Sequence, residues 1–195
     1  MLKGKNIVLY PIQKNDLEKL WQWINDREQV LFNAPYRPVS DEQHIKWFET
    51  IQKSSDLHCF IVKLKENAAP IGSCQLVNIH PIHRTAEVQI RIGEVSQRGK
   101  GYGTEALRLL MDFAFNDLNL HRVQLHVFST NASARRVYEK IGFVLEGTMK
   151  EAAYIDGRYV DLEMMRLLKQ EYVWLKATLF TENVVIHDNC CYSST

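Results

Sequence analysis

The sequence predicts an α/β domain in which a mixed, largely antiparallel sheet of about seven strands is flanked by about four helices. Three observations support this fold class. Segments with apolar residues at alternate positions, typical of strands, are interleaved with segments whose apolar residues recur at helical spacing. Three strand-like segments follow one another between residues 58 and 92, as in an antiparallel meander. Asp156-Gly157, the strongest short hairpin signal, separates two long strand-like runs.

The first half of the chain predicts a strand, two helices and the meander. NIVLY, at 6–10, is a short strand, and apolar residues at helical spacing predict a helix over about 16–25. The prolines of NAPYRP end that region. Ser40 and Gln43 then match a capping box that opens a second helix. The strands of the meander are 58–65, 70–79 and 86–92.

The second half predicts a long helix, a strand, a shorter helix and the hairpin. The long helix follows a glycine-rich segment and runs for about four turns to Leu118. A strand over 122–128 comes next. Apolar residues from Ala134 to Ile141 predict the shorter helix, which stops at Gly142 because glycine is favoured just after a helix C-terminus.

Periodicity fades near the C-terminus. We therefore expect residues 1–172 to form one domain and residues 173–195 to be a tail that forms no separate domain. TENVVIHDNCCYSST has neither a clear period nor a cap, which is typical of a loose tail or of one exchanged with a partner chain.

Composition narrows the class of protein. Lys plus Arg (24) nearly equals Asp plus Glu (23), whereas a protein that binds nucleic acid directly usually carries a basic excess. No apolar run approaches the roughly 18 residues of a membrane span, and the N-terminus is too interrupted by charge for a signal peptide. We expect a cytoplasmic protein with no membrane contact. The scattered cysteines, at positions 59, 74, 190 and 191, match neither a disulfide framework nor a zinc site.

The segment SQRGKGYGTEALRLL, at 96–110, places three glycines immediately before the long helix. Glycine adopts positive φ and lets another molecule approach the backbone, while a helix N-terminus offers unpaired N–H groups to an anion. The segment therefore suits a pyrophosphate. It is not G-x-x-x-x-G-K-[ST], and no acidic residue ends the next strand, so ATP and NAD are disfavoured. A glycine turn without a ligand is the alternative.

A second pair of residues lies on the shorter helix. Seven helical positions bring Tyr138 back to nearly the same face as Asn131, about 10 Å further along. Each residue also has a purely structural explanation. Asn131 suits a helix cap and Tyr138 suits the apolar stripe of the helix.

Together, R-x-x-G-x-G before a helix and N-x-S-x-R-x-x-Y-E-K-x-G-F after the next strand resemble the GNAT superfamily of acyl-CoA-dependent N-acetyltransferases. The resemblance covers roughly residues 6–170. EGTMKEAAYIDGRYVDLEMMRLL is similar to the end of the ribosomal-protein N-terminal acetyltransferases. NIHPIHRTAEVQI and NDLNLHRVQLHV are similar to bacterial spermidine acetyltransferases.

The resemblance implies a sheet splayed in its middle and a binding site for acetyl-CoA. It implies that the pyrophosphate is held by backbone N–H groups of Arg98, Gly99, Lys100, Gly101, Tyr102, Gly103 and Thr104, with charge added by Lys100 or Arg98. The backbone of Ile90, Arg91 and Ile92 would pair with the pantetheine arm, and Asn131 would bond this arm from the other side. Tyr138 would stand near the thioester sulfur.

The implied chemistry is direct attack of a primary amine on the thioester in a ternary complex. Fixing the two reactants together can supply most of the acceleration. Tyr138 is the candidate general acid for the departing thiolate. Glu87 is the candidate base for the amine, with His83 or His126 as alternatives and a structural salt bridge as the other role for Glu87. We expect no metal, since His80 and His83 lie beside a proline with no further ligand at suitable spacing.

The acceptor should bind between the two N-terminal helices, the NAPYRP loop and the final hairpin. Acidic residues there, Asp26, Glu28, Asp41 and Glu42, alternate with Arg27, Arg37 and Lys46. The sequence therefore does not identify the acceptor amine, which is carried by a small molecule or by a protein N-terminus. The alternative functions are a polyamine acetyltransferase or sensor and a non-catalytic acyl-CoA-binding module. We also expect a homodimer, because such a sheet leaves an edge to cover.

Overall fold

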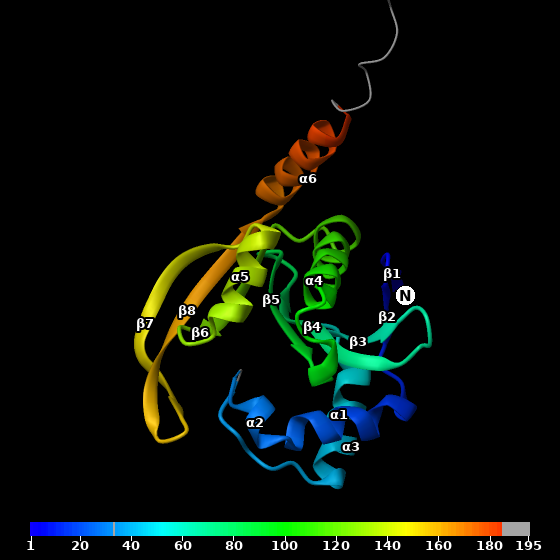
Figure 1. The fold of residues 1–195 in the computed structure, drawn as a ribbon, viewed down its shortest axis with the longest axis vertical. Helices are drawn as coiled ribbons and strands as arrows, with labels where there is room; N and C mark the ends of the chain where they lie inside the picture. Colours follow the sequence, from blue (N-terminus) through cyan, green and yellow to red (C-terminus); the bar gives the residue numbers. More distant parts are fainter. Residues whose placement is uncertain (33, 185–195) are drawn as a thin grey trace, which may run out of the picture.

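A computed structural model describes residues 1–32 and 34–184 of the chain. Eight strands form one sheet in the order β1-β2-β3-β4-β5-β6-β8-β7 (Figure 1). The strands are β1 (Leu2–Lys3), β2 (Ile7–Pro11), β3 (His58–Leu64), β4 (Pro70–His80), β5 (Thr85–Ile92), β6 (Arg122–Phe128), β7 (Val144–Ile155) and β8 (Arg158–Leu168). Neighbouring strands are antiparallel except β5 and β6, which confirms the predicted mixed, largely antiparallel sheet.

Helices cover both faces of the sheet. They are α1 (Leu17–Asn25), α2 (Arg27–Val30), α3 (Asp41–Lys53), α4 (Tyr102–Asp112), α5 (Ala132–Ile141) and α6 (Lys169–Val184). Apolar residues of α4 and α5 share one buried cluster with the sheet, and those of α1 and α3 share another with Ile12 and Ile61. Alternation along the strands supplies both clusters, since successive side chains point to opposite faces.

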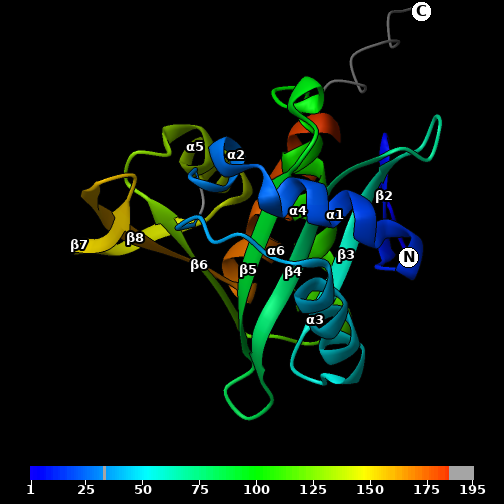
Figure 2. The same cartoon turned by 90° about the horizontal axis from the view of Figure 1, so that it is seen from below.

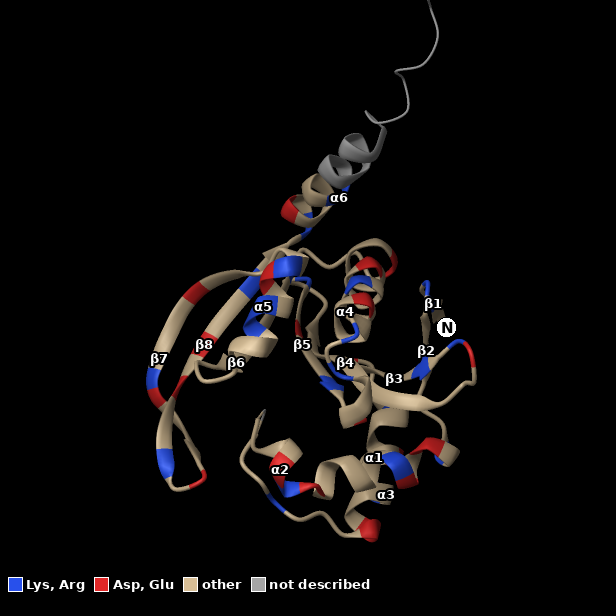
Figure 3. Ribbon diagram, viewed as in Figure 1, with Lys and Arg blue, Asp and Glu red and all other residues tan. Residues whose placement is uncertain are grey.

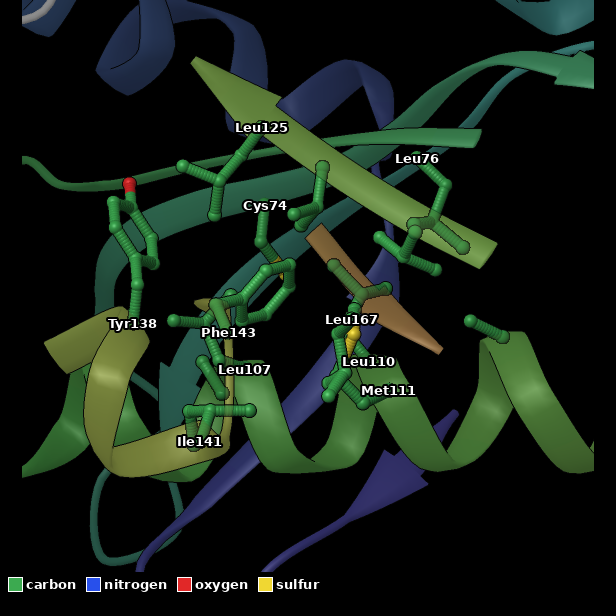
Figure 4. Close-up of a cluster of buried hydrophobic side chains, with 14 of the residues drawn as sticks. Cys74, Leu76, Leu107, Leu110, Met111, Leu125, Tyr138, Ile141, Phe143 and Leu167 are labelled. Atoms are coloured by element: carbon green, nitrogen blue, oxygen red, sulfur yellow. The ribbon is translucent and has the colours of Figure 1, made fainter. Parts of the chain in front are cut away.

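The main core lies between α4 and the sheet. Leu107, Leu110 and Met111 of α4 are fully buried, and Figure 4 shows them packed with Leu125 and Leu167 of the strands. A π-helical turn, Phe113–Asp117, continues α4 to the length predicted from the sequence. Burial of this stripe fixes α4, and hence the position of its N-terminus, against the middle of the sheet.

The splay predicted for the sheet lies between β5 and β6. The two strands pair only at Thr85↔Arg122, Ala86↔Val123 and Glu87↔Gln124. Beyond these positions β5 pairs only with β4 and β6 only with β8. Figure 2 shows β5 and β6 diverging from this point. The backbone of β5 from Val88 onward is therefore open on the side that faces β6.

Three elements differ from the predictions. β1 is an eighth strand, too short at two residues to leave a periodic signal. α2 is a single turn capped by Asp26, which accepts a hydrogen bond from Gln29 N at 3.2 Å. The first part of the predicted tail is helical, because α6 begins at Lys169 and projects from the domain (Figure 1). The end of the predicted tail, including Cys190 and Cys191, lies outside the described residues.

Contacts at the start of α6 explain why the chain stays helical there. Tyr172 is 5% exposed and packs on Phe115, with ring centroids 5.3 Å apart. Its hydroxyl donates to the Asp112 carboxylate at 3.1 Å. These contacts are made with α4 and its extension, so periodicity within the tail could not predict them.

Among the described residues, no helix is both long and apolar enough to cross a membrane.

Candidate active site

The glycine-rich segment forms the cradle at the N-terminus of α4. Gly99 and Gly101 have φ of 76° and 86°, a region that disfavours residues with a Cβ. Gly101 is the N-cap of α4. A Cβ added at either glycine would meet nothing within 4 Å, so the space in front of them is open. An open, positively polarised helix end is a good fit for the diphosphate of acetyl-CoA.

The two basic residues of this segment are held by neighbouring groups. Arg98 donates to Ile92 O at 2.9 Å and to Gln29 Oε1 at 2.6 Å, which ties the loop to β5 and α2. Lys100 donates to Gln97 Oε1 at 3.0 Å on the exposed side of the loop. The loop is therefore anchored next to the open end of β5, where Ile90, Arg91 and Ile92 lie.

A cavity of about 680 Å³ extends from the splay towards the N-terminal helices. Its walls come from α1, the segment after α2, α3 and the final hairpin, as the sequence predicted for the acceptor site. Trp23, Phe32 and Trp47 give it aromatic surface, and Ala153 and Leu162 belong to the hairpin. Two further aromatic residues of the N-terminal segment, Trp21 and Tyr36, donate hydrogen bonds to the backbone instead. Trp21 Nε1 donates to Val39 O at 2.8 Å and Tyr36 Oη donates to Asn25 O at 3.4 Å.

Tyr138 lines the cavity from α5 and is 7% exposed. Its ring meets Phe143 edge to face at 6.0 Å, and its hydroxyl points away from the apolar cluster that contains Leu107 and Ile141 (Figure 4). Burial raises the pKa of Tyr138 to about 12. Tyr138 is thus both a packing residue and a protonated phenol facing the site.

Glu87 lies at the last position where β5 pairs with β6, and it also lines the cavity. Its Oε2 is 3.7 Å from Nδ1 of His126, which projects from the neighbouring strand β6. This places the predicted base and one of its two alternatives side by side. The structure does not bring His83 to the cavity. That residue lies beyond the end of β4, its ring stacked on His80 at 4.1 Å.

A hydrogen-bonded row crosses the cavity floor and ends at Glu87. The Cys59 thiol donates to Gln75 Oε1 at 3.1 Å, Gln75 Nε2 donates to Gln89 Oε1 at 2.6 Å, and Gln89 Nε2 donates to Glu87 Oε1 at 3.3 Å. The row spans β3, β4 and β5. Sequence analysis missed Gln75 and Gln89, although period-2 alternation places Gln89 on the same face of β5 as Glu87.

Asn131 has a structural role in the described chain. Its Oδ1 accepts from Ala134 N at 3.1 Å and caps α5, and its Nδ2 donates to Phe32 O at 3.0 Å. The capping explanation raised by the sequence is confirmed. The amide therefore links α5 to the segment after α2, and its predicted bond to the pantetheine arm stays a prediction.

Charged residues other than Glu87 and Arg91 do not line the cavity in the described part of the chain. The carboxylates at 26, 28, 41 and 42 lie elsewhere, and Figure 3 shows positive and negative residues interspersed over the elements.

The cysteines of the described chain are suited neither to reaction nor to metal binding. Burial raises the thiol pKa of Cys59 to about 12 and that of Cys74 still further. Within residues 1–32 and 34–184, no group of three or more His, Cys, Asp or Glu side chains could hold a metal ion.

Comparisons with known proteins agree with this geometry. A family model described as an acetyltransferase (GNAT) domain matches residues 6–144. The spermidine N(1)-acetyltransferase of Vibrio cholerae serotype O1 is 32% identical over 172 residues, which is 87% of this chain and 97% of the relative. The enzyme of the same name from Escherichia coli K12 is 31% identical over 175 residues, 89% of this chain and 91% of the relative.

A solved structure supports the same fold. The crystal structure of spermidine N-acetyltransferase from Vibrio cholerae in complex with CoA and spermine matches with a TM-score of 0.80 at 31% identity. The match covers 86% of this chain and 98% of that chain. The two proteins therefore share the splayed sheet and the helices around it over nearly the whole of the solved chain.

Proposed function

This chain belongs to the GNAT acetyltransferase family and is an acetyl-CoA-dependent N-acetyltransferase, and from that premise we propose how its residues carry out the reaction. One observation supports the proposal above the others. The backbone of β5 becomes open just beyond Glu87, and Glu87, His126 and Tyr138 all line the cavity that meets this opening. A thioester in the opening would lie between an acid and a base.

We assign binding of acetyl-CoA to the glycine segment and to β5. Acetyl-CoA supplies the acetyl group as a thioester. Backbone N–H groups from Gly99 to Thr104 hold its diphosphate at the start of α4, where the helix dipole favours negative charge. The backbone N–H of Arg98, which the sequence also assigned to this role, instead donates to Val95 O at 3.1 Å. Backbone groups of Ile90, Arg91 and Ile92 on the side of β5 away from β4 pair with the pantetheine arm, and Asn131 borders the arm from α5.

Proton transfers complete the reaction at the open end of β5. Glu87 accepts a proton from the ammonium of the acceptor, directly or through His126, and the neutral amine forms a C–N bond to the acetyl carbon. The C–S bond breaks, and the Tyr138 hydroxyl gives its proton to the departing thiolate. The tyrosine regains a proton from the carboxyl of Glu87 through solvent. As the amide forms, the attacking nitrogen loses its second proton to solvent. The products are the amide, free coenzyme A and this one released proton, and no net proton remains on the enzyme.

The pKa values of the site suit this transfer. A phenol with pKa about 12 is a poor donor to a thiol of ordinary pKa, about 8.5. Burial, however, also raises the pKa of a thiol in this cavity, as for Cys59, to about 12. A departing thiolate that is desolvated in the same way would be a stronger base than a thiolate in water, which favours proton transfer from the Tyr138 phenol.

Substitution of the acid and of the base tests these roles. In Tyr138→Phe we expect kcat for thiol release to fall by about 10²–10⁴, the usual contribution of a general acid. In Glu87→Gln we expect a loss that shrinks as pH rises, because more of the amine is then already neutral. Tyr154→Phe, an exposed tyrosine on β7, is the control. Unchanged kcat in Tyr138→Phe at all pH values would refute the acid role.

The relatives favour polyamine acetylation or polyamine sensing as the second candidate, since spermidine N(1)-acetyltransferases match over most of the chain. A panel of spermidine, amino sugars and N-terminal peptides distinguishes this candidate from other amines. Coenzyme A binding without turnover of any amine would favour the non-catalytic module instead. A spermidine-dependent change in light scattering would favour a sensor.

The expected homodimer and the expected cytoplasmic location stay predictions. β7 is one of the two edge strands of the sheet, and it exposes Val144, Leu145 and Met149. Apolar side chains on an unpaired edge are a common contact between copies of a chain. Sedimentation of the purified protein tests the dimer.

A further inference from the structure

The cavity contains a cation, the guanidinium of Arg91, that has no partner among the described residues. Alternation along β5 places Glu87, Gln89 and Arg91 on the face towards α1 and α3, and all three line the cavity. Arg91 is half-buried. Among the described residues it has no hydrogen-bond or ion-pair partner, whereas the guanidinium of Arg98 is bonded to Ile92 O and Gln29.

The surroundings of Arg91 call for an anion. Burial lowers its pKa, and the nearby charge of Arg98 lowers it further, yet a guanidinium stays protonated in proteins. A buried charge without a partner is costly, so such a site is completed by a group of opposite charge. A carboxylate matches the fork of guanidinium N–H groups and forms two parallel hydrogen bonds with it.

The geometry of β5 separates this anion from the diphosphate assigned to the glycine segment. Val88 and Ile90 alternate with Glu87, Gln89 and Arg91 along β5 and therefore point to the opposite face, where they pack towards α4. Ile92 points to the same face as Val88 and Ile90, and a Cβ added at Gly103 of α4 would lie 3.7 Å from it. Arg91 thus points to the acceptor side of β5, whereas the first residues of α4 lie towards the opposite face. Arg98 is the residue of the glycine segment whose charge reaches Arg91.

The remaining lining argues against a polycation. Glu87 is the one carboxylate among the described lining residues, and its charge is balanced by that of Arg91. His44 also lines the cavity, and burial lowers its pKa and favours the neutral ring. A spermidine molecule, with three ammonium groups, would find one carboxylate and would be repelled by Arg91.

We propose that the acceptor is a primary amine that carries a carboxylate several bonds away, with the carboxylate bound by Arg91 and the amine directed to Glu87. The proposal rests on the function proposed above. Arg91 is four positions after Glu87 along β5, a rise of about 13 Å, which suits a chain longer than an α-amino acid. Trp23, Phe32 and Trp47 provide apolar walls for the part between the charged ends.

Matched acceptors test the proposal. We compare ω-aminocarboxylates of five to eight carbons with alkylamines of equal length and with spermidine, and measure kcat/KM for thiol release. We expect the best aminocarboxylate to exceed its alkylamine at least tenfold. Peptides with a glutamate at position 2 or 3 form a second arm, which distinguishes a protein N-terminus from a small molecule. Preference for the alkylamine or for spermidine would overturn the proposal.

Variants connect the preference to the guanidinium. Arg91→Met should abolish the preference, Arg91→Lys should keep part of it, and Arg91→Glu should raise activity on spermidine. Arg158→Met removes an exposed arginine at the start of β8 that does not line the cavity, and it should keep the wild-type preference. A preference that survives in Arg91→Met would assign the carboxylate to another group and refute the proposal.

Calorimetry separates failure of this inference from failure of the proposed function. Titration of 6-aminohexanoate and hexylamine into the complex with coenzyme A measures binding without turnover. Tighter binding of the aminocarboxylate, lost in Arg91→Met, supports the role of Arg91 even if the proposed acid and base are wrong. If Arg91→Met instead loses affinity for coenzyme A itself, Arg91 serves the cosubstrate and the inference fails.

Discussion

Burial of the Tyr138 hydroxyl has a consequence for stability as well as for chemistry. Its pKa is about 12 in the folded chain, against about 10 for an unfolded tyrosine. Between these pH values the unfolded state loses a proton that the folded state keeps, so the contribution of Tyr138 to stability falls as pH rises. Below pH 10 both states are protonated and the contribution is fully present.

We therefore predict that wild type and Tyr138→Phe differ in their response to alkaline pH. From pH 9 to pH 11.5 the wild type should lose about 2 kcal/mol more of its free energy of unfolding than the variant. Urea unfolding at the two pH values measures this difference. Tyr154→Phe controls for tyrosine ionisation in general, because that ring is 57% exposed. Parallel losses in wild type and Tyr138→Phe would show that the hydroxyl is not desolvated.

At the scale of elements, the start of α4 contains one glycine that its backbone conformation requires and one that it does not. Gly101 has φ of 86°, which costs other residues about 1–2 kcal/mol, whereas Gly103 is the second residue of the helix and has no positive φ. Both are glycines of the same segment. They form a matched pair for substitution by alanine.

We predict opposite effects on stability. Gly101→Ala should lower the free energy of unfolding by about 1–2 kcal/mol, and its methyl group should weaken coenzyme A binding by entering the open space before the amides. Gly103→Ala should raise the free energy of unfolding by up to about 1 kcal/mol, since alanine favours a helix. Its Cβ would make only an ordinary contact of 3.7 Å with Ile92. Urea unfolding and calorimetry measure both effects. Equal coenzyme A affinity of Gly101→Ala and wild type would contradict the role of the loop.

Elements with local signals could be predicted from the sequence, and those fixed by distant contacts could not. The capping box of Ser40 and Gln43 forms as predicted. The helix α5 ends at Gly142, with φ of 104°, and Asp156 and Gly157, with φ of 48° and 82°, make the hairpin turn. By contrast, β1 is held by pairing to β2, and α6 by packing on α4. Neither contact leaves a pattern in its own segment.

At the scale of the whole molecule, the site is predictable only where one segment carries it. The glycine loop and the tyrosine on α5 each have a motif of their own. The cavity floor does not, because Cys59, Gln75 and Gln89 come from three strands that meet only through the register of the sheet. The role of Arg91 is equally hidden, since a sequence shows the residue but not that its guanidinium lacks a partner in the described part of the chain.

Docking of α6 joins the C-terminal part of the chain to the core, and we predict that Tyr172 dominates this contact. Tyr172→Ala should lower the free energy of unfolding by about 3–5 kcal/mol, as for other buried aromatic residues. Tyr172→Phe keeps the ring on Phe115 but loses the bonds to Arg108 O and Asp112 Oδ1, and should cost about 1–2 kcal/mol. Val173→Ala is the control, because its side chain is 52% exposed and should matter by less than about 0.5 kcal/mol. Urea unfolding monitored by fluorescence measures all three, and wild-type stability in Tyr172→Ala would mean that α6 contributes nothing to the domain.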